Sequence, residues 1–365
     1  MHVILLTNDV AGKGGIGNYF AVLKGRFGIP VDYLITGSRA SEKGLLRTIF
    51  RFFSDYVSFL KRCRSYDLIH LNTSLRIKSV CRDALFCLLA SIMRKRFLVF
   101  IHGWDHELAR AIEKRFLWIY RGMFFRASAM VVLSKDFAET LQQWGYHKPI
   151  YLSTTIVDDR MVQGLAQQKM RVRNSENGYF NILFLARMER AKGIYIVLDT
   201  MKHLQSKYAN FRLLIAGDGK ELESAIKYTH DRQVDQVEFL GFVRDEEKKQ
   251  CFLRSDLYLF PTFWGEGMPT SLVEAMAFGL PVITRPVGGI ADFFTDGSMG
   301  YLTESRDPKV YAELIEKLFL EPDLRSRMGR YNHQYAVEHF TVSQAVRRLE
   351  QIYDHVTRHP DVSGS

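Results

Sequence analysis

Two glutamates, Glu266 and Glu274, stand eight positions apart in the segment "PTFWGEGMPTSLVEAMAFGLPVI" (residues 261–283), which contains no basic residue. Acidic side chains are seldom buried unless they are paired or bind something. Pro269 and the helix-forming run after it predict a helix, and Gly279 predicts where that helix ends. Glu266 would then lie on the loop before the helix, and Glu274 would project from its second turn.

The start of this helix is a candidate anion site, with Thr270 or Ser271 available to cap it. A helix N-terminus offers unpaired N–H groups and a positive dipole end, which suit a phosphate group. Carboxylates beside it can accept strong hydrogen bonds from sugar hydroxyls. The alternative is an ordinary helix with one solvated and one capping glutamate, and the segment by itself leaves both interpretations open.

Short apolar runs alternate with helical patterns along the whole chain. The first series predicts strands at 2–9, 67–74, 97–103 and 129–134, with helices at 44–63, 76–95 and 107–126. A stretch without periodicity, 163–179, predicts a linker. A second series predicts strands at 180–188, 211–219, 237–243, 257–262 and 281–289, followed by a helix at 341–356. This order is typical of α/β proteins, and we expect two Rossmann-like domains with ligand-facing residues at the carboxyl ends of parallel strands.

Positive charge is concentrated in the first half of the chain. The net charge is +10, but residues 1–150 carry 23 Lys and Arg against 11 Asp and Glu, so the remainder is close to neutral. Such an asymmetry indicates an anionic partner or simply a basic soluble face. Residues 44–64 combine basic and aromatic side chains, which is typical of an interfacial membrane helix, although a core-facing aromatic stripe is the alternative. No nucleic-acid recognition module is evident.

Other features of the sequence concern the compartment. No apolar run reaches 18 residues, and the first residues lack the pattern of a secretory signal. The four cysteines are scattered, without metal-ligand spacing. We therefore expect a reduced, cytoplasmic setting.

The segment "EGMPTSLVEAMAFGLPVI" resembles the E-x7-E hallmark of the retaining glycosyltransferases of family 4, which have the GT-B fold. Further segments of the second half match that family in the right order: "LFLARMERAKG" (183–193), "IAGDGKELESAI" (215–226) and "VGGIADFFTDGSMGYL" (287–302). The first half matches more loosely, through "GKGGIGNY", "LIHLNTS", "IHGWD" and "VVLSKD". The resemblance implies two Rossmann-like domains facing each other across a cleft.

The resemblance also implies domain boundaries. Residues 1–160 would form an N-terminal acceptor-binding domain, 161–179 a linker, and 180–340 a nucleotide-sugar-binding domain. Residues 341–365 would form a helix that crosses back to the first domain, followed by a polar tail.

Residue roles follow from the same resemblance. Glu274 would bind the ribose hydroxyls, and Glu266 would lie against the transferred sugar. Arg187 and Lys192 would neutralise the leaving diphosphate, and His102 would lie near the sugar. The remaining donor-side residues would be Gly267, Met268, Thr270, Gly14, Gly15 and Gly217, and the acceptor-side residues would be Asn18 and Ser134. No Asp-x-Asp pair is present, so two fixed cations would replace a divalent metal, and no cofactor is expected.

Several residues of the first half could instead serve only the fold. His102 could be a structural histidine at a strand end, and Ser134 could be no more than a helix cap. The Gly14–Gly15 turn would also suit a dinucleotide-binding site. However, no acidic residue stands at the end of a suitable second strand, where it would bind the ribose of the dinucleotide. In the second half, Pro269 and Asp292 depart from the usual family pattern, which leaves the donor sugar open.

The function expected is therefore metal-independent, retaining transfer of a hexose from a nucleotide-diphosphate sugar to a glycan or polyprenyl-linked acceptor. Bacterial surface polysaccharide synthesis (exopolysaccharide, O-antigen or capsule) is the expected setting. The basic N-terminal domain is expected to dock on the anionic inner leaflet of the cytoplasmic membrane. The alternatives are a nucleotide-sugar epimerase or phosphorylase of GT-B build, and a non-catalytic protein that binds nucleotide sugars.

Overall fold

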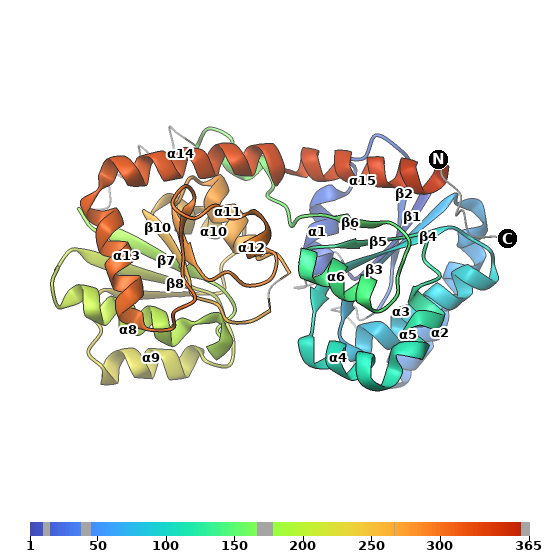
Figure 1. Cartoon of the computed structure of the whole chain (residues 1–365), viewed down its shortest axis with the longest axis horizontal. Helices are drawn as coiled ribbons and strands as arrows, with labels where there is room; N and C mark the ends of the chain where they lie inside the picture. Colours follow the sequence, from blue (N-terminus) through green and yellow to red (C-terminus); the bar gives the residue numbers. More distant parts are fainter. Residues whose placement is uncertain (10–14, 38–44, 166–177, 266, 359–365) are drawn as a thin grey trace. The chain divides into compact units, whose positions relative to one another are not determined.

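The computed structural model of the chain describes residues 1–9, 15–37, 45–165, 178–265 and 267–358. They form two compact units (Figure 1). The first comprises Met1–Thr155, Gly265–Met268 and Val342–Ser365, and the second comprises Ile156–Trp264 and Pro269–Thr341. Each unit is a parallel sheet flanked by helices, which confirms the predicted α/β class with two Rossmann-like folds.

The first unit contains a six-stranded parallel sheet in the order β2-β1-β3-β4-β5-β6. Its inner strands β1, β3, β4 and β5 are almost wholly buried, which explains why β1, β4 and β5 read as nearly continuous apolar runs. The strands are β1 (Val3–Thr7), β2 (Val31–Ile35), β3 (Leu68–Leu75), β4 (Phe97–Trp104), β5 (Ala129–Val132) and β6 (Ile150–Leu152).

The helices of the first unit are α1 (Gly15–Leu23), α2 (Leu45–Arg62), α3 (Ile77–Ile92), α4 (His106–Ala111), α5 (Leu117–Phe124), α6 (Lys135–Gln143) and α15 (Val342–Arg358). The single helix predicted over 107–126 is divided, because a π-helical turn at Ile112–Phe116 separates α4 from α5. The last helix belongs to this unit: the Tyr353 hydroxyl lies 2.7 Å from Nδ1 of His70, and the Gly28 amide donates to Glu350 at 2.6 Å.

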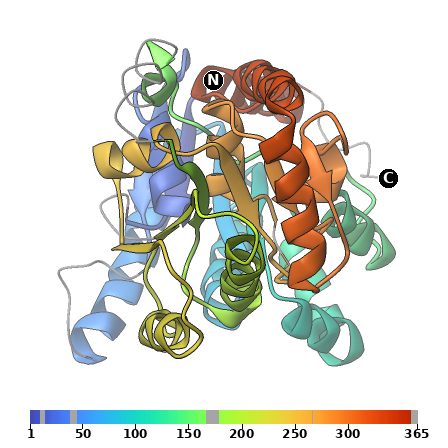
Figure 2. The ribbon, with the colours of Figure 1, turned by 90° about the vertical axis from the view of Figure 1, so that its left-hand side faces the viewer.

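The second unit contains a six-stranded parallel sheet in the order β12-β11-β10-β7-β8-β9. Its strands are β7 (Phe180–Leu185), β8 (Phe211–Ala216), β9 (Val237–Gly241), β10 (Leu257–Phe260), β11 (Val282–Thr284) and β12 (Gly300–Leu302). Its helices are α8 (Ile194–Gln205), α9 (Leu222–Asp231), α10 (Asp245–Leu253), α11 (Thr270–Ala277), α12 (Ile290–Phe293), α13 (Pro308–Leu320) and α14 (Pro322–His339). Figure 2, in which this unit faces the viewer, shows helices around its sheet.

Both sheets reverse their strand order once. In the first sheet the reversal lies between β1 and β3, and in the second it lies between β7 and β10. The crossover connections leave in opposite directions at such a point, which opens a crevice beyond the carboxyl ends of the two strands. The residues after β7 and β10 therefore occupy the position where this kind of sheet binds ligands.

Some predictions of secondary structure were incomplete. The strands β6 and β12 were not predicted as separate elements, because three residues are too few to show a pattern. Most of the predicted linker, along with Gly14 and Glu266, lies outside the described residues. Within the described part of the chain, every helix is too short or too polar to cross a bilayer.

Candidate functional site

Two cations follow strand β7. The Arg187 side chain is 56% exposed, and its Nη1 lies 2.6 Å from Oε1 of Glu189. Lys192 is only 6% exposed and ends a 3-10 turn, Arg190–Lys192. Its Nζ lies 6.0 Å from the ring centroid of Phe260, at the end of β10. Both strands that flank the reversal of the second sheet therefore contribute to the surroundings of Lys192.

The turn that carries Lys192 is fixed to the loop after β10. Gly193 has a φ of +89°, and a Cβ there would lie 2.5 Å from the carbonyl oxygen of Pro261. Only glycine permits both the left-handed backbone and this close approach. The Phe263 amide also donates to the Ala191 carbonyl at 2.9 Å. The local backbone thus holds Lys192 in a defined place at the crevice.

Gly217 makes a similar close approach at the end of β8. Its φ is +139°, and a Cβ there would lie 1.9 Å from the Ala186 carbonyl oxygen. The Met188 amide donates to the Asp218 carbonyl at 2.9 Å, so the loops after β7 and β8 are joined on either side of Arg187. The structure therefore gives Gly217 a role in shaping the loop that carries Arg187.

Glu274 is buried in the second turn of α11, with 5% of the residue exposed. Its Oε1 lies 2.6 Å from Nζ of Lys248, which comes from α10. Burial raises the pKa of Glu274, and the positive charge of Lys248 opposes that increase. The interpretation of Glu274 as a solvated helix residue is wrong, because the carboxylate lies in the protein interior beside a lysine.

The first turn of α11 differs from its prediction in one respect. The helix begins at Thr270, directly after Pro269, so Thr270 is not at the capping position. The Oγ of Ser271 lies 2.7 Å from the Tyr258 hydroxyl, which is also 3.0 Å from the Leu185 carbonyl oxygen. The expectation that Thr270 or Ser271 caps the helix is wrong; Ser271 instead ties α11 to β7 and β10.

The end of α11 agrees with its prediction. Gly279 has a φ of +66°, as a glycine that ends a helix should. A Cβ there would lie 3.0 Å from the Gly329 carbonyl oxygen, so α11 and α14 meet at two glycines. This contact fixes the helix that carries Glu274.

The predicted residues of the first unit lie on separate elements. His102 is half-buried near the carboxyl end of β4, and its Nε2 lies 3.0 Å from Oδ1 of Asn72. Ser134 is the N-cap of α6, where its hydroxyl accepts a hydrogen bond from the Asp136 amide at 3.2 Å. Gly15 is the first residue of α1, and Asn18 is exposed on the same helix. Helix capping therefore accounts for the position of Ser134.

Gly267 and Met268 form part of the segment before α11, and both are half-buried.

Arg187, Lys192, Gly217 and Glu274 thus lie on α11 or in the loops after β7 and β8 of the second unit. Sequence reasoning missed Lys248 and Asn72. Lys248 stands in the charged run "DEEKKQ", which suggests a solvated helix face. Asn72 stands in a strand and shows no motif. Both were found only through their partners, Glu274 and His102.

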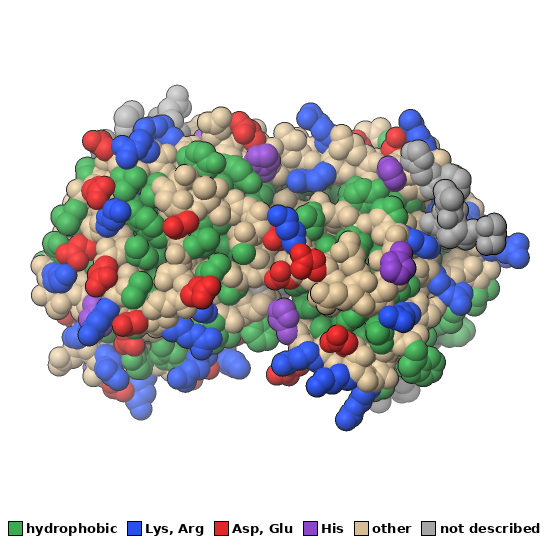
Figure 3. Space-filling model, viewed as in Figure 1, with side chains coloured by type: hydrophobic (Ala, Val, Ile, Leu, Met, Phe, Trp, Pro, Cys, Tyr) green, Lys and Arg blue, Asp and Glu red, His purple; other side chains and the backbone are tan. Residues whose placement is uncertain are grey.

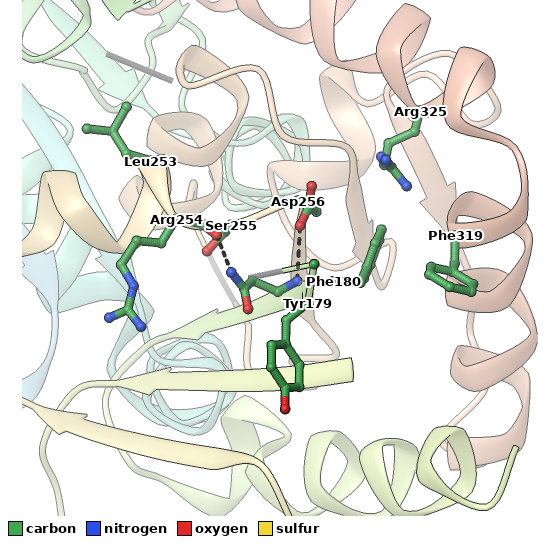
Figure 4. Close-up of a pocket in the computed structure, with 10 residues that line it drawn as sticks. Tyr179, Phe180, Leu253, Arg254, Ser255, Asp256, Phe319 and Arg325 are labelled. Atoms are coloured by element: carbon green, nitrogen blue, oxygen red, sulfur yellow. Dashed lines mark hydrogen bonds between the residues drawn. The ribbon is translucent and has the colours of Figure 1, made fainter. Parts of the chain in front are cut away.

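A cavity of about 320 Å³ lies elsewhere in the second unit (Figure 4). Phe180, Asp256 and Arg325 contribute to its lining. Phe180 begins β7, and Asp256 directly precedes β10. The cavity is therefore at the amino ends of these strands, at the edge of the sheet opposite Lys192.

The residues that the structure describes contain no cluster of three or more His, Cys, Asp or Glu side chains arranged to hold a metal ion.

Two family models match the chain. Residues 166–335 match the model described as glycosyl transferases group 1, and residues 18–150 match the glycosyl transferase 4-like domain. The two matches correspond to the second and first units, respectively.

Curated relatives are similar over about half of their length. Spore coat protein SA of Bacillus subtilis is 28% identical over 197 residues, which are 52% of this chain and 52% of that protein. The capsular polysaccharide biosynthesis glycosyltransferase CapM of Staphylococcus aureus is 32% identical over 182 residues, 49% of this chain and 47% of that protein. The chain therefore spans about half the length of the curated relatives it matches.

A solved structure extends the similarity of fold to the whole chain. Anabaena Alr3699/HepE, crystallised in complex with UDP and glucose, has a TM-score of 0.73 and 17% identity, covering 97% of this chain and 99% of that chain. This similarity confirms the predicted GT-B fold, and the two family models identify the chain as a glycosyltransferase. The chain belongs to the GT-B glycosyltransferases of the family 4 type.

Proposed function

We propose that the chain is a retaining glycosyltransferase that moves a hexose from a nucleotide-diphosphate sugar to a glycan or lipid-linked acceptor. The observation that carries this proposal is the set of groups around β7 and β10. A buried carboxylate, Glu274, lies on the helix that begins at this crevice, and two cations, Arg187 and Lys192, follow β7. Acceptors for ribose hydroxyls and donors for a diphosphate thus come from neighbouring elements of one unit.

Each group has a defined task in the proposed reaction. Arg187, Lys192 and the N-terminus of α11 stabilise the negative charge that develops on the departing diphosphate. Glu274 accepts hydrogen bonds from the ribose hydroxyls. By family resemblance, Glu266 and His102 hold hydroxyls of the transferred sugar.

Bond making and breaking occur on one face of the sugar. The anomeric carbon loses its bond to the diphosphate oxygen as the acceptor hydroxyl oxygen bonds to the same face. The acceptor proton passes to the departing phosphate, and the products are the glycoside and a nucleoside diphosphate. The fixed cations give this scheme its charge stabilisation without a divalent metal.

A surface polysaccharide pathway is the setting that we propose. The similarity to a glycosyltransferase of capsular polysaccharide biosynthesis supports it. The structure of HepE with UDP and glucose makes UDP-glucose the first donor to test.

A thermal-shift screen across UDP-, GDP- and ADP-sugars tests donor binding. A donor that binds only the folded chain stabilises it by RT ln(1 + L/Kd), where L is the free donor concentration, and so raises the melting temperature. Glu274→Ala should abolish that shift, whereas Glu316→Ala, which removes a surface carboxylate of the same unit, should preserve it. The bound donor should then be hydrolysed slowly or transferred. Binding without either reaction would contradict the proposal and favour a non-catalytic nucleotide-sugar-binding protein.

The membrane part of the proposal concerns helices α2, α3 and α5. The aromatic stripe predicted in residues 44–64 is divided: Phe59 is fully buried against Phe86 of α3, whereas Phe50 and Phe53 are 75% and 69% exposed. Further large apolar side chains are exposed on neighbouring elements: Ile77, Ile92, Phe116 and Trp118. We take these exposed apolar residues, with exposed basic residues near them in the sequence such as Arg94, Lys114 and Arg115, as one candidate docking face. Figure 3 shows hydrophobic and basic side chains side by side over this part of the first unit.

An anionic membrane surface is the partner that this face fits, because apolar side chains can enter the headgroup region while basic residues attract acidic lipids. Flotation with liposomes of phosphatidylglycerol and phosphatidylcholine should bring the chain to the top of the gradient at low salt. Phe53→Ser combined with Trp118→Ser should weaken flotation, and Phe242→Ser, an exposed aromatic of the second unit, should not. Absence of flotation at low salt would refute docking on the membrane.

A further inference from the structure

A buried amide joins three neighbouring strands of the first unit. Asn72 of β3 is 4% exposed, and its Nδ2 donates to the carbonyl oxygen of Leu6 in β1 at 2.8 Å. Its Oδ1 lies 3.0 Å from Nε2 of His102 in β4. The Asn72 side chain therefore links β1 and β4, the two strands on either side of β3, at the point where the first sheet reverses its strand order.

The chemistry of the three groups fixes the direction of both hydrogen bonds. A backbone carbonyl can only accept, so the amide nitrogen of Asn72 must face Leu6 and its oxygen must face His102. An amide oxygen also only accepts. Nε2 of His102 must therefore carry the hydrogen, and in the neutral ring Nδ1 is then a bare acceptor.

The surroundings keep the ring neutral. Burial and the neighbouring His70 hold the pKa of His102 well below its ordinary value, and burial lowers the pKa of His70 itself to about 3. The other titratable groups nearby are Tyr19 of α1 and Tyr353 of α15. Burial raises the pKa of Tyr19 to about 12 and that of Tyr353 well above its ordinary value, so both are protonated at neutral pH. Of the charged side chains on α15, Arg348 lowers the pKa of Tyr19 and Glu350 raises that of Tyr353.

Aromatic rings hold the imidazole plane in place. The His102 ring stacks on Phe100 with centroids 3.8 Å apart, and the edges of Tyr19 and Phe20 approach it with centroid distances of 5.2 and 5.7 Å. Nδ1 makes no hydrogen bond to any side chain or backbone group of the described residues. The direction of this free lone pair is thus set by the aromatic contacts and by Asn72.

We propose that Asn72 is a positioning residue that locks His102 in the Nε2–H tautomer, so that Nδ1 accepts a hydrogen bond from a hydroxyl of the transferred sugar. This inference rests on the proposed function for the identity of the ligand, but the tautomer lock itself does not. A sugar with fluorine or a methoxy group in place of that hydroxyl has no hydrogen to donate and is discriminated against.

NMR of the full-length chain with nitrogen-15-labelled histidine tests the proposed tautomer of His102 without any ligand. Long-range proton–nitrogen spectra distinguish a protonated from an unprotonated ring nitrogen, and wild type should show Nε2–H at His102. Asn72→Leu, which removes the acceptor, should give a mixture of tautomers, whereas Asn72→Asp, which keeps an acceptor, should retain Nε2–H. Asn181→Leu is the matched control, since Asn181 is a buried amide of β7 that donates to the Arg254 carbonyl at 2.7 Å. An Nδ1–H signal in wild type, or an unchanged tautomer in Asn72→Leu, would overturn the lock.

Kinetics with UDP-glucose and its deoxyfluoro analogues test the assignment to a sugar hydroxyl. One neutral hydrogen bond corresponds to about tenfold in kcat/KM, so one analogue should lose about tenfold with wild type and little with Asn72→Leu. Asn72→Asp should retain more discrimination than Asn72→Leu. If wild type and Asn72→Leu show the same loss of kcat/KM with every analogue, the assignment of Nδ1 to a sugar hydroxyl is wrong. If wild type turns over no nucleotide sugar while the tautomer behaves as expected, the proposed function fails and the lock stands.

Discussion

The ion pair between Lys248 and Glu274 offers a direct test of how the second unit holds its buried carboxylate. Lys248→Met removes the ammonium group and keeps most of the apolar stem. The Glu274 carboxylate then remains inside the protein, with only 6% of its side chain exposed, and without its cation. A buried charge without a partner is costly, so the folded state should lose stability or Glu274 should take up a proton.

The size of the effect follows from the geometry. At a separation of 2.6 Å the two charges attract each other by about 6 kcal/mol at an effective dielectric constant of about 20, and desolvation of both groups offsets much of this. Loss of one partner from a fully buried pair costs about 3–5 kcal/mol. Because the Lys248 side chain is 24% exposed, the pair is not fully buried, and we expect a smaller loss of folding free energy, about 2–3 kcal/mol. For a unit of this size the loss corresponds to a decrease in Tm of about 4–12 °C.

The pH dependence has a defined sign. Folding raises the pKa of Glu274 above its ordinary value of 4.5, so the stability associated with this group is fully present below that value and is lost as the pH rises through the folded pKa. Removal of Lys248 raises the folded pKa further. The difference in Tm between wild type and Lys248→Met should therefore be largest near pH 8 and shrink toward pH 4.5.

Differential scanning calorimetry at several pH values measures this difference. Lys207→Met is the matched control, because Lys207 pairs with Glu316 at 2.9 Å on the surface of the same unit, and little change is expected there. Glu274→Gln in the Lys248→Met background should recover part of the loss, since a neutral amide replaces the unpaired charge. Equal Tm values for wild type and Lys248→Met at pH 8 would refute the electrostatic reasoning.

Three further predictions concern the crevice of the second unit. Gly217→Ala should lower the Tm by circular dichroism much more than Gly25→Ala, because both have positive φ but only the Cβ at Gly217 would strike a carbonyl oxygen, at 1.9 Å. Equal decreases in Tm for the two variants would mean that the chain relieves the close approach at Gly217 without losing stability. Lys192→Met should reduce the kcat for donor hydrolysis by about a hundredfold, as loss of one group that stabilises a developing charge usually does, and an unchanged kcat in initial-rate assays would remove Lys192 from the mechanism. Transfer should proceed equally well with excess EDTA and with added Mg²⁺, and a rate that EDTA abolishes and Mg²⁺ restores would contradict the metal-independent scheme.

Apolar runs located the strands β7 and β8 approximately, and the family resemblance singled out Arg187, Lys192 and Gly217 at or beyond their carboxyl ends. In a parallel sheet, the residues after such runs come to one edge whatever the details of packing. Glu274 could be placed in the second turn of a helix by the same local reasoning, from Pro269 to Gly279.

The partners of these residues could not be predicted, because they depend on which elements become neighbours. Lys248 reaches Glu274 only because α10 packs beside α11, and nothing in a charged helical run indicates that one lysine turns inward. Asn72 meets His102 only because β3 lies between β1 and β4 in a particular register. The helix cap was predicted wrongly for a related reason: Ser271 finds a tertiary partner in Tyr258.

The return of the last helix to the first unit has a consequence for how the protein is made. Apart from the short segment Gly265–Met268, the chain leaves the first unit after Thr155 and returns to it at Val342. At about 5–20 residues per second, a ribosome needs about 10–40 s to synthesise the residues between these points. Throughout that interval His70 lacks Tyr353 and the Gly28 amide lacks Glu350. The half of the protein that is translated first is therefore completed last, and a nascent chain stalled before residue 342 should expose the α15-facing side of its first sheet to chaperones.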